Sequence, residues 1–212
     1  MREYSVPASF GLGDEENLVN PVYDMAARRG GAVAFRRRGA DGSWSDMTAA
    51  EFTAEVTAVA QGLVAAGVGV GDRVALLSRT RFEWTLVDYA IMAVGGVTVP
   101  IYETSSAEQI SWILSDSGAV AIVLETAGHR ELAESVRADL PGLRHVWQIE
   151  TDGPAGGAVA QLKELGADTP ADEVHARRQQ VGADHLASLI YTSGTTGRPK
   201  AASSPTATSS PR

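Results

Sequence analysis

The order of hydrophobic and polar residues changes repeatedly between two spacings along the chain. From residue 48 to residue 64, apolar side chains such as Phe52, Val56 and Val59 recur every three or four positions, which predicts a helix with one buried face. Residues 73–78 instead form a short, mostly apolar run between turn residues, which predicts a buried strand. Similar runs predict strands at residues 97–102, 119–124, 145–149 and 186–191. Helices are predicted between them, at residues 82–94, from the Ser105–Glu108 cap to about Gly118, and at residues 130–140, 159–165 and 173–181.

The N-terminal part of the chain follows a different pattern. Residues 20–30 begin with the pair Asn20-Pro21 and end in glycine, which is typical of a short helix with Asn20 as its N-cap. Residues 32–37 and 43–47 are predicted to be two strands joined by a glycine-rich turn, and thus a β-hairpin. The segment Thr48–Glu51 then has the spacing of a capping box, which starts the next helix.

Strands that alternate with helices are typical of α/β proteins. The sequence therefore predicts a mostly parallel sheet with helices on both faces, and a small β-hairpin near the N-terminus. We expect residues 1–200 to form this part of the molecule. Residues 201–212 are rich in serine, threonine, proline and alanine and have no apolar period, so we expect this tail to be disordered.

Composition narrows the class of protein. Apolar residues make up 44% of the 212 residues and charged residues 21%, which is ordinary for a soluble globular protein. The net charge of −8 argues against a protein that binds nucleic acid through its phosphates. The absence of cysteine excludes disulfides, thiolate metal sites and a cysteine nucleophile. The histidines lie far apart in the sequence, which gives little support for a histidine metal site.

No segment of the sequence has the pattern of a membrane span. The most apolar stretch, residues 90–102, contains Gly95, Gly96 and Pro100 and is shorter than the roughly 20 residues that a spanning helix needs. Residues 1–10 lack the apolar core of a signal peptide. We therefore expect a cytoplasmic protein, with peripheral association with a membrane as the alternative that the sequence leaves open.

The segment with the strongest chemical signal is Tyr191–Lys200, which begins at the end of the last predicted strand. Its glycines allow positive φ and close approach to a ligand, and successive N–H groups in such a turn can hold an anion. Its hydroxyl groups and its lysine add donors suited to phosphate oxygens. The spacing is not that of a Walker loop, because two residues separate Gly194 from Gly197 and Ala201 follows the lysine. The candidate phosphate-binding residues are Thr192, Ser193, Gly194, Thr195, Thr196, Gly197 and Lys200.

Other polar and aromatic residues have ordinary structural explanations. The three arginines at residues 36–38 are expected at the solvated edge of the hairpin. Arg79 and Arg81 are expected to pack against and cap the helix that follows them. Residues 103–106 are explained by the cap of the next helix, and Tyr191 by packing at the end of its strand.

The decapeptide Tyr191–Lys200 resembles the phosphate-binding signature of the adenylate-forming (AMP-binding) superfamily. Residues 100–109 are similar to the corresponding stretch of the long-chain fatty acid–CoA ligases, as are residues 71–75 and 81–84. The resemblance extends over nearly the whole chain, from Met1 to Lys200. It implies a two-step reaction, in which a fatty carboxylate attacks the α-phosphate of ATP and coenzyme A then displaces AMP to form a thioester.

The resemblance also assigns roles to the candidate loop. It implies that the loop residues named above bind the β- and γ-phosphates of ATP, and that the hydroxyl group of Ser193 helps to place Mg²⁺. ATP and Mg²⁺ are the implied cofactors, with coenzyme A as co-substrate and a fatty acid as substrate.

The pattern of the family stops at Lys200. Family members continue with a glycine and an apolar strand, whereas Ala201–Pro205 follows here. We therefore expect an N-terminal fragment of a ligase with an out-of-frame tail, inactive by itself and prone to self-association through uncovered apolar surface. The alternatives are a related ligase for another carboxylate, a non-catalytic module that binds a nucleotide or a partner, and a translation product without a selected role.

Overall fold

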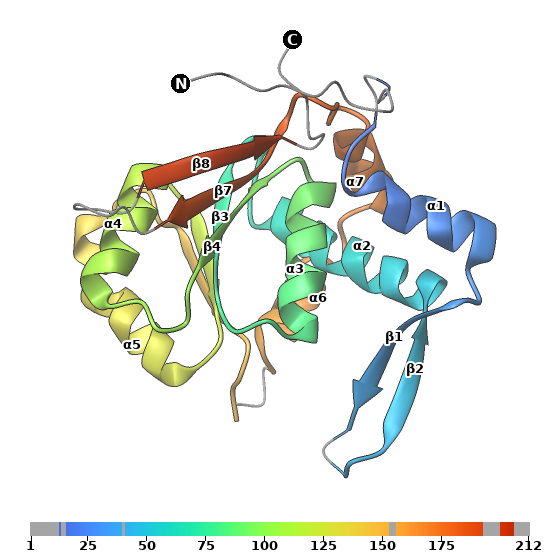
Figure 1. Cartoon of the computed structure of the whole chain (residues 1–212), viewed down its shortest axis with the longest axis horizontal. Helices are drawn as coiled ribbons and strands as arrows, with labels where there is room; N and C mark the ends of the chain where they lie inside the picture. The colour runs from blue at the N-terminus through green and yellow to red at the C-terminus, as the bar shows by residue number, and fades with distance from the viewer. Residues whose placement is uncertain (1–12, 14–15, 40, 153–155, 193–199, 206–212) are drawn as a thin grey trace, which may run out of the picture.

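A β-sheet with helices on both faces forms the centre of the computed structural model, which describes residues 13, 16–39, 41–152, 156–192 and 200–205 (Figure 1). Within these residues the sheet has six strands in the order β6-β5-β3-β4-β7-β8. Strands β3 to β7 are parallel, and β8 runs antiparallel to β7. The strands are β3 (Arg73–Leu77), β4 (Val97–Ile101), β5 (Ala121–Leu124), β6 (His145–Gln148), β7 (Leu186–Thr192) and β8 (Lys200–Pro205). The prediction of a mostly parallel α/β sheet is confirmed.

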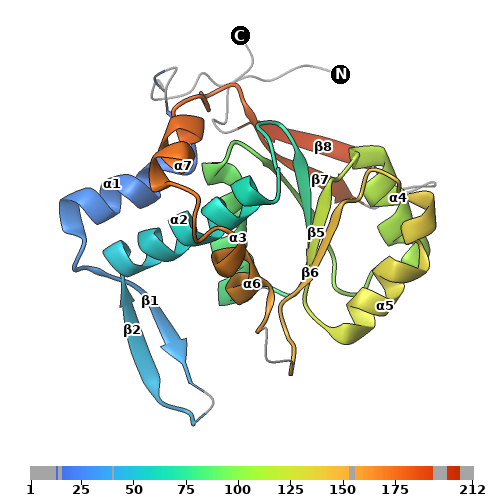
Figure 2. The same ribbon diagram turned by 180° about the vertical axis from the view of Figure 1, so that it is seen from behind.

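The central strands are apolar along their length because both faces of the sheet are covered. Val74 and Leu76 of β3 pack into a core with α2 and α3, whereas Ala75 and Leu77 pack into a second core with α4 and α5. Figures 1 and 2 show these two groups of helices on opposite sides of the sheet. The helices are α1 (Asn20–Arg29), α2 (Ala49–Ala65), α3 (Phe82–Ala93), α4 (Ala107–Ser117), α5 (Ala127–Ser135), α6 (Ala158–Leu165) and α7 (Ala171–Arg178), with a 3₁₀ turn at Arg137–Asp139.

The predicted hairpin is present as β1 (Val33–Arg38) and β2 (Trp44–Thr48), which pair antiparallel and project from the body of the molecule (Figure 1). The start of α1 differs from the prediction, because Asn20 lies in the first turn and Val19 precedes the helix. The cap comes from Asn17 instead, whose Oδ1 accepts the N–H groups of Val19 and Asn20. Asn17 also donates to the carbonyl of Val181, 164 residues away, so its role depends on the fold.

Two helices on the sheet begin with capping boxes. The predicted box of α2 is confirmed, since the Thr48 side chain accepts from the N–H of Glu51 and the Glu51 carboxylate accepts from the N–H of Thr48. The box of α4 lies one position later than predicted and uses Ser106 and Gln109. Gly118 ends α4 with φ of 62°, a left-handed conformation that glycine adopts without strain.

The C-terminal strand differs from the expectation. Residues 201–205, which we expected to be disordered, belong to β8, where Ala202 pairs with Ile190 of β7. Such a strand needs few apolar side chains, because the backbone groups along the free edge of β7 supply its hydrogen-bond partners. The expectation of disorder is therefore wrong for residues 201–205, and residues 206–212 lie outside the described part of the chain.

Candidate functional site

The predicted phosphate loop begins where the parallel strands end. Thr192 is the last residue of β7, Lys200 is the first residue of β8, and the two pair across the antiparallel ladder. The ends of the loop are therefore held beside each other at the carboxyl edge of the sheet, where α/β proteins commonly bind ligands. The loop residues between them lie outside the described part of the chain; they include Ser193, Gly194, Thr195, Thr196 and Gly197.

A groove of about 430 Å³ lies along the same edge, at the ends of β3, β4 and β7. Its lining includes Ser78 and Arg79 after β3, Tyr102 and Glu103 after β4, and Tyr191 near the end of β7. The ring of Tyr102 is 72% exposed and thus available to a ligand in the groove. These residues come from three separate segments, so only the fold brings them together.

Tyr191 anchors the strand that leads into the loop. It is buried, and its hydroxyl donates to the Asp116 carboxylate of α4 at 2.7 Å. Burial raises the pKa of the Tyr191 hydroxyl, and the nearby Asp116 carboxylate raises it further. The prediction that Tyr191 packs at the end of its strand is confirmed.

A buried carboxylate organises the segment after β3. Glu125, which directly follows β5, is 1% exposed. It accepts hydrogen bonds from the Arg79 N–H at 2.9 Å, from the Arg79 guanidinium at 2.6 and 2.9 Å, and from the Ser78 hydroxyl at 3.2 Å. Burial alone would raise the pKa of Glu125, but the hydrogen bonds from Arg79 and Ser78 outweigh it and lower the pKa to about 2.

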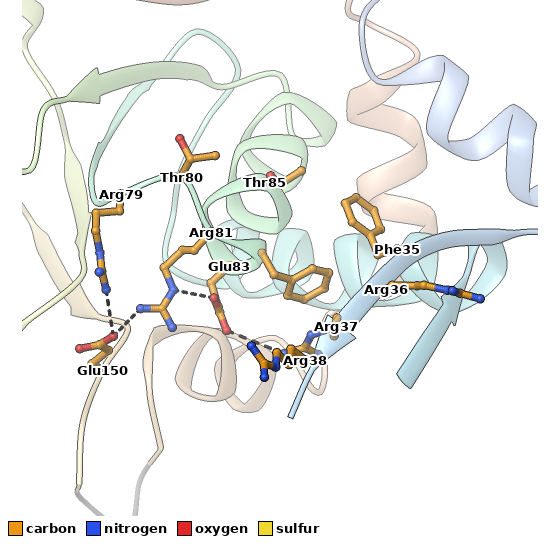
Figure 3. A pocket seen from close by; sticks show the side chains of 11 residues that line it. Phe35, Arg36, Arg37, Arg38, Arg79, Thr80, Arg81, Glu83, Thr85 and Glu150 are labelled. Atoms are coloured by element: carbon orange, nitrogen blue, oxygen red, sulfur yellow. Dashed lines mark hydrogen bonds and ion pairs between the residues drawn. The ribbon is translucent and has the colours of Figure 1, made fainter. Parts of the chain in front are cut away.

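The network extends from Glu125 to two further carboxylates. Arg81 lies 2.6 Å from Glu150 and 2.7 Å from Glu83 (Figure 3). It also lies 3.1 Å from Glu125. The expectation that Arg79 and Arg81 pack against and cap α3 holds in part. Arg81 occupies the N-cap position and pairs with Glu83 in the first turn, but its side chain makes no capping hydrogen bond, and the Arg79 side chain bonds to Glu125 instead. The sequence signal for this network was a glutamate, Glu125, directly after a buried strand. Its partners could not be identified from the sequence, because they lie 44 to 47 positions away in the chain.

The three hairpin arginines differ in the side chains that they contact. Arg36 pairs with Asp46 across the hairpin at 2.8 Å, as expected of a solvated strand edge. Arg37 reaches α3, where its guanidinium lies 4.1 Å from the centre of the Phe82 ring and 3.8 Å from Glu83. Arg38 forms no ion pair with any described residue.

No metal site is visible in the described ranges, which contain no group of three or more histidine, aspartate or glutamate side chains placed to hold an ion. Ser193, the residue expected to help place Mg²⁺, lies outside those ranges.

Comparison with known proteins decides the family. Residues 22–207 match the family described as AMP-binding enzyme. The chain belongs to this family. The resemblance inferred from the Tyr191–Lys200 decapeptide is therefore confirmed, and the matched region includes both the loop and β8.

Two relatives are long-chain fatty acid–CoA ligases of the AMP-binding family. The chain is 46% identical over 200 residues to the long-chain-fatty-acid–CoA ligase FadD15 of Mycobacterium bovis (strain ATCC BAA-935 / AF2122/97), and 46% identical to FadD15 of Mycobacterium tuberculosis (strain ATCC 25618 / H37Rv). The alignments cover 94% of this chain and 33% of each relative. The chain thus spans about a third of the length of these relatives.

Solved structures of AMP-binding enzymes share the fold. The anthranilate CoA ligase AuaEII in complex with anthranoyl-AMP matches with a TM-score of 0.72 and 25% identity, over 92% of this chain and 35% of that one. The N-terminal domain of FACL13 from Mycobacterium tuberculosis also matches with a TM-score of 0.72, at 26% identity over 90% of this chain and 44% of the domain. The sheet and its helices therefore correspond to the N-terminal part of such ligases. Among the described helices, none has the length and apolar character needed to cross a bilayer.

Proposed function

We propose that the chain is the N-terminal part of an ATP-dependent long-chain fatty acid–CoA ligase, and that it supplies the loop that binds the β- and γ-phosphates of ATP. The observation that carries the proposal is the position of the decapeptide Tyr191–Lys200. It begins on β7 and ends on β8, at the edge where the parallel strands end. The 46% identity to the FadD15 ligases supports the fatty acid branch.

The proposed chemistry has two steps. The carboxylate oxygen of a fatty acid attacks the α-phosphorus of ATP, and the bond to the bridging oxygen breaks to release pyrophosphate. The thiol of coenzyme A then attacks the acyl carbon, loses its proton, and displaces AMP. Reactions at phosphorus depend mainly on positioning and charge neutralisation, so groups that hold the departing phosphates contribute directly to the rate.

The residues of this chain act in the first step. The backbone N–H groups of Gly194 and Gly197, the hydroxyls of Thr192, Ser193, Thr195 and Thr196, and the Lys200 ammonium group would donate to the β- and γ-phosphate oxygens. The pairing of Thr192 with Lys200 closes the loop at its base, which limits the conformations from which it binds. The Ser193 hydroxyl would help to hold Mg²⁺, which would neutralise further phosphate charge.

The chain offers a sharp test of phosphate binding, because Lys163 and Lys200 are its only lysines. We expect ATP to protect Lys200, but not Lys163, from acetylation, as measured by mass spectrometry of peptides. Lys163 is a matched control, since it lies on α6 and pairs with Glu55 at 2.8 Å. Equal acetylation of Lys200 with and without ATP would contradict the proposal.

The same proposal predicts the activity of the chain by itself. Since the chain spans 33% of the relatives, we expect it to bind ATP without forming acyl-CoA. The assay would combine the purified chain with ATP, Mg²⁺, palmitate and coenzyme A and measure the thioester. Appreciable thioester formation would show that the groups needed for both steps lie within these 212 residues.

A further inference from the structure

A second cavity, of about 670 Å³, lies between the hairpin and the start of α3. Arg37 and Arg38 of β1 form one side of it, and Arg79 and Arg81 after β3 form the other (Figure 3). Strand β7, which leads into the predicted phosphate loop, is the second strand along from β3 in the sheet. Neither β7 nor β8 lines the cavity, although Arg79 and Thr80 line both the cavity and the groove beside the loop.

The positive and negative charges of the side chains around the cavity do not sum to zero. Arg36 points away from the other arginines and pairs with Asp46 (Figure 3). Of the four remaining arginines, Arg37 approaches Glu83, and Arg79 and Arg81 contact Glu150 and the buried Glu125. Arg38 also lines the cavity and forms no ion pair with a described residue. Positive groups thus outnumber negative ones here by one, although the whole chain carries a net charge of −8.

Two of the arginines are held in fixed positions. Glu125 accepts from the Arg79 guanidinium at 2.6 Å and from Arg81 at 3.1 Å, so both side chains stay at the cavity wall. Fixed guanidinium groups bind phosphate oxygens well, because their planar sets of N–H donors match the anion and little side-chain entropy is lost on binding.

The other two arginines, Arg37 and Arg38, have guanidinium N–H donors that no close ion pair with a described residue uses. Arg37 rests on the Phe82 ring and approaches a carboxylate no closer than 3.8 Å, and Arg38 makes no ion pair with a described residue. The first turn of α3 also lines the cavity, and its N-terminus has no side-chain cap. The partial positive charge of a helix N-terminus favours an anion at the same place.

From these contacts we propose that the arginine-lined cavity binds an anion with two linked phosphate groups, at a site separate from the ATP loop. The shared chemistry is that of a diphosphate, whether inorganic or part of a nucleotide. The inference does not depend on the function proposed for the loop.

The test measures binding of inorganic pyrophosphate to the Lys200→Ala chain by titration calorimetry at low ionic strength. The lysine is removed so that the loop contributes less to binding. We expect one pyrophosphate per chain, and we expect the additional change R37Q/R38Q to weaken binding at least tenfold. Neither arginine contacts the buried Glu125, but Arg37 rests on Phe82 and approaches Glu83, so circular dichroism and thermal melts would check that R37Q/R38Q keeps the fold.

The matched control is R28Q/R29Q in the same Lys200→Ala chain. Arg28 and Arg29 lie at the end of α1, outside the lining of the cavity, and their replacement makes the same change in net charge. We expect this control to bind within twofold of its parent. Equal weakening in both variants would reduce the effect to overall charge and overturn the proposal.

Further arms separate the site from the loop and identify the ligand. If pyrophosphate binding is lost in Lys200→Ala but unchanged by R37Q/R38Q in the parent chain, the loop binds it and the cavity proposal is wrong, while the proposed function stands. If ATP fails to protect Lys200 but the cavity still binds pyrophosphate, the function proposed for the loop is wrong, while the cavity proposal stands. ADP that competes with pyrophosphate at similar affinity would indicate a nucleotide diphosphate, and no competition would indicate the inorganic form.

Discussion

Glu125 is a single buried carboxylate on which the whole segment after β3 depends. Its partners Ser78, Arg79 and Arg81 lie on one stretch of chain, and Arg81 in turn contacts Glu150 after β6. One side chain therefore fixes the ends of three parallel strands relative to one another. It also fixes Arg79, which lines both the groove beside the loop and the arginine-lined cavity.

We expect Glu125→Gln to lower the free energy of unfolding at pH 7 by about 3 kcal/mol, because it removes the buried charge that pairs with both Arg79 and Arg81. The pKa of Glu125 falls from an ordinary 4.5 to about 2 in the folded chain. Its stabilising contribution is thus complete above pH 4.5 and is lost as the pH falls towards 2. Urea unfolding of both chains between pH 7 and pH 2 would measure this.

The control for this prediction is Glu164→Gln, at an exposed position on α6. We expect it to change the free energy of unfolding by less than about 0.5 kcal/mol. A difference between wild type and Glu125→Gln that stays constant from pH 7 to pH 2 would contradict the assigned ionisation.

At the level of elements, α2 and α6 approach each other closely. A methyl group added at Gly62 of α2 would overlap the backbone carbonyl of Leu162, and one added at Gly166 would overlap the backbone of Gly62. The two helices therefore approach backbone to backbone. A glycine in the interior of α2 has a packing reason, although glycine is a poor helix former.

We expect Gly62→Ala to destabilise the chain by about 3 kcal/mol or more, because rigid backbone atoms must move apart. Helix propensity alone predicts the opposite sign, a gain of about 1 kcal/mol. Thermal or urea unfolding distinguishes the two. The control is Gly142→Ala, where an added methyl meets nothing within 4 Å; its effect should stay below about 0.5 kcal/mol.

At the level of the whole molecule, β6 and β8 are the two outer strands of the described sheet. Strand β8 pairs with β7 and so forms one edge. Ile190 of β7, the strand next to β8, is 41% exposed. An apolar side chain beside an edge strand favours association with another chain. We propose that the chain self-associates at this edge.

We expect light scattering to show concentration-dependent dimers or larger species, and Ile190→Ser to shift the population towards monomer. Val33→Ser is the control, because Val33 is 52% exposed on β1, far from β8 in the fold. A monodisperse monomer at all concentrations, or an equal effect of the two substitutions, would contradict the assignment of this edge.

Features that depend on neighbouring residues were predictable from the sequence. The capping box at Thr48 and Glu51, the turn at Gly118 and the buried run at Arg73–Leu77 follow from hydrogen bonds and apolar spacing within a few residues. The alternation of these elements predicted the parallel α/β sheet. The decapeptide Tyr191–Lys200 predicted the family through its resemblance to the phosphate-binding signature of that family.

Features that join distant segments were decided by the tertiary structure. Glu125 meets Arg79, 46 positions away, only because β5 lies beside β3 in the sheet, and Asn17 caps α1 while bound to a carbonyl 164 positions away. The composition of residues 201–205 indicated disorder, yet β8 forms because the edge of β7 offers backbone partners. The physical reason is common to all three: the hydrogen-bond partners lie far apart in the sequence, and only the fold places them side by side.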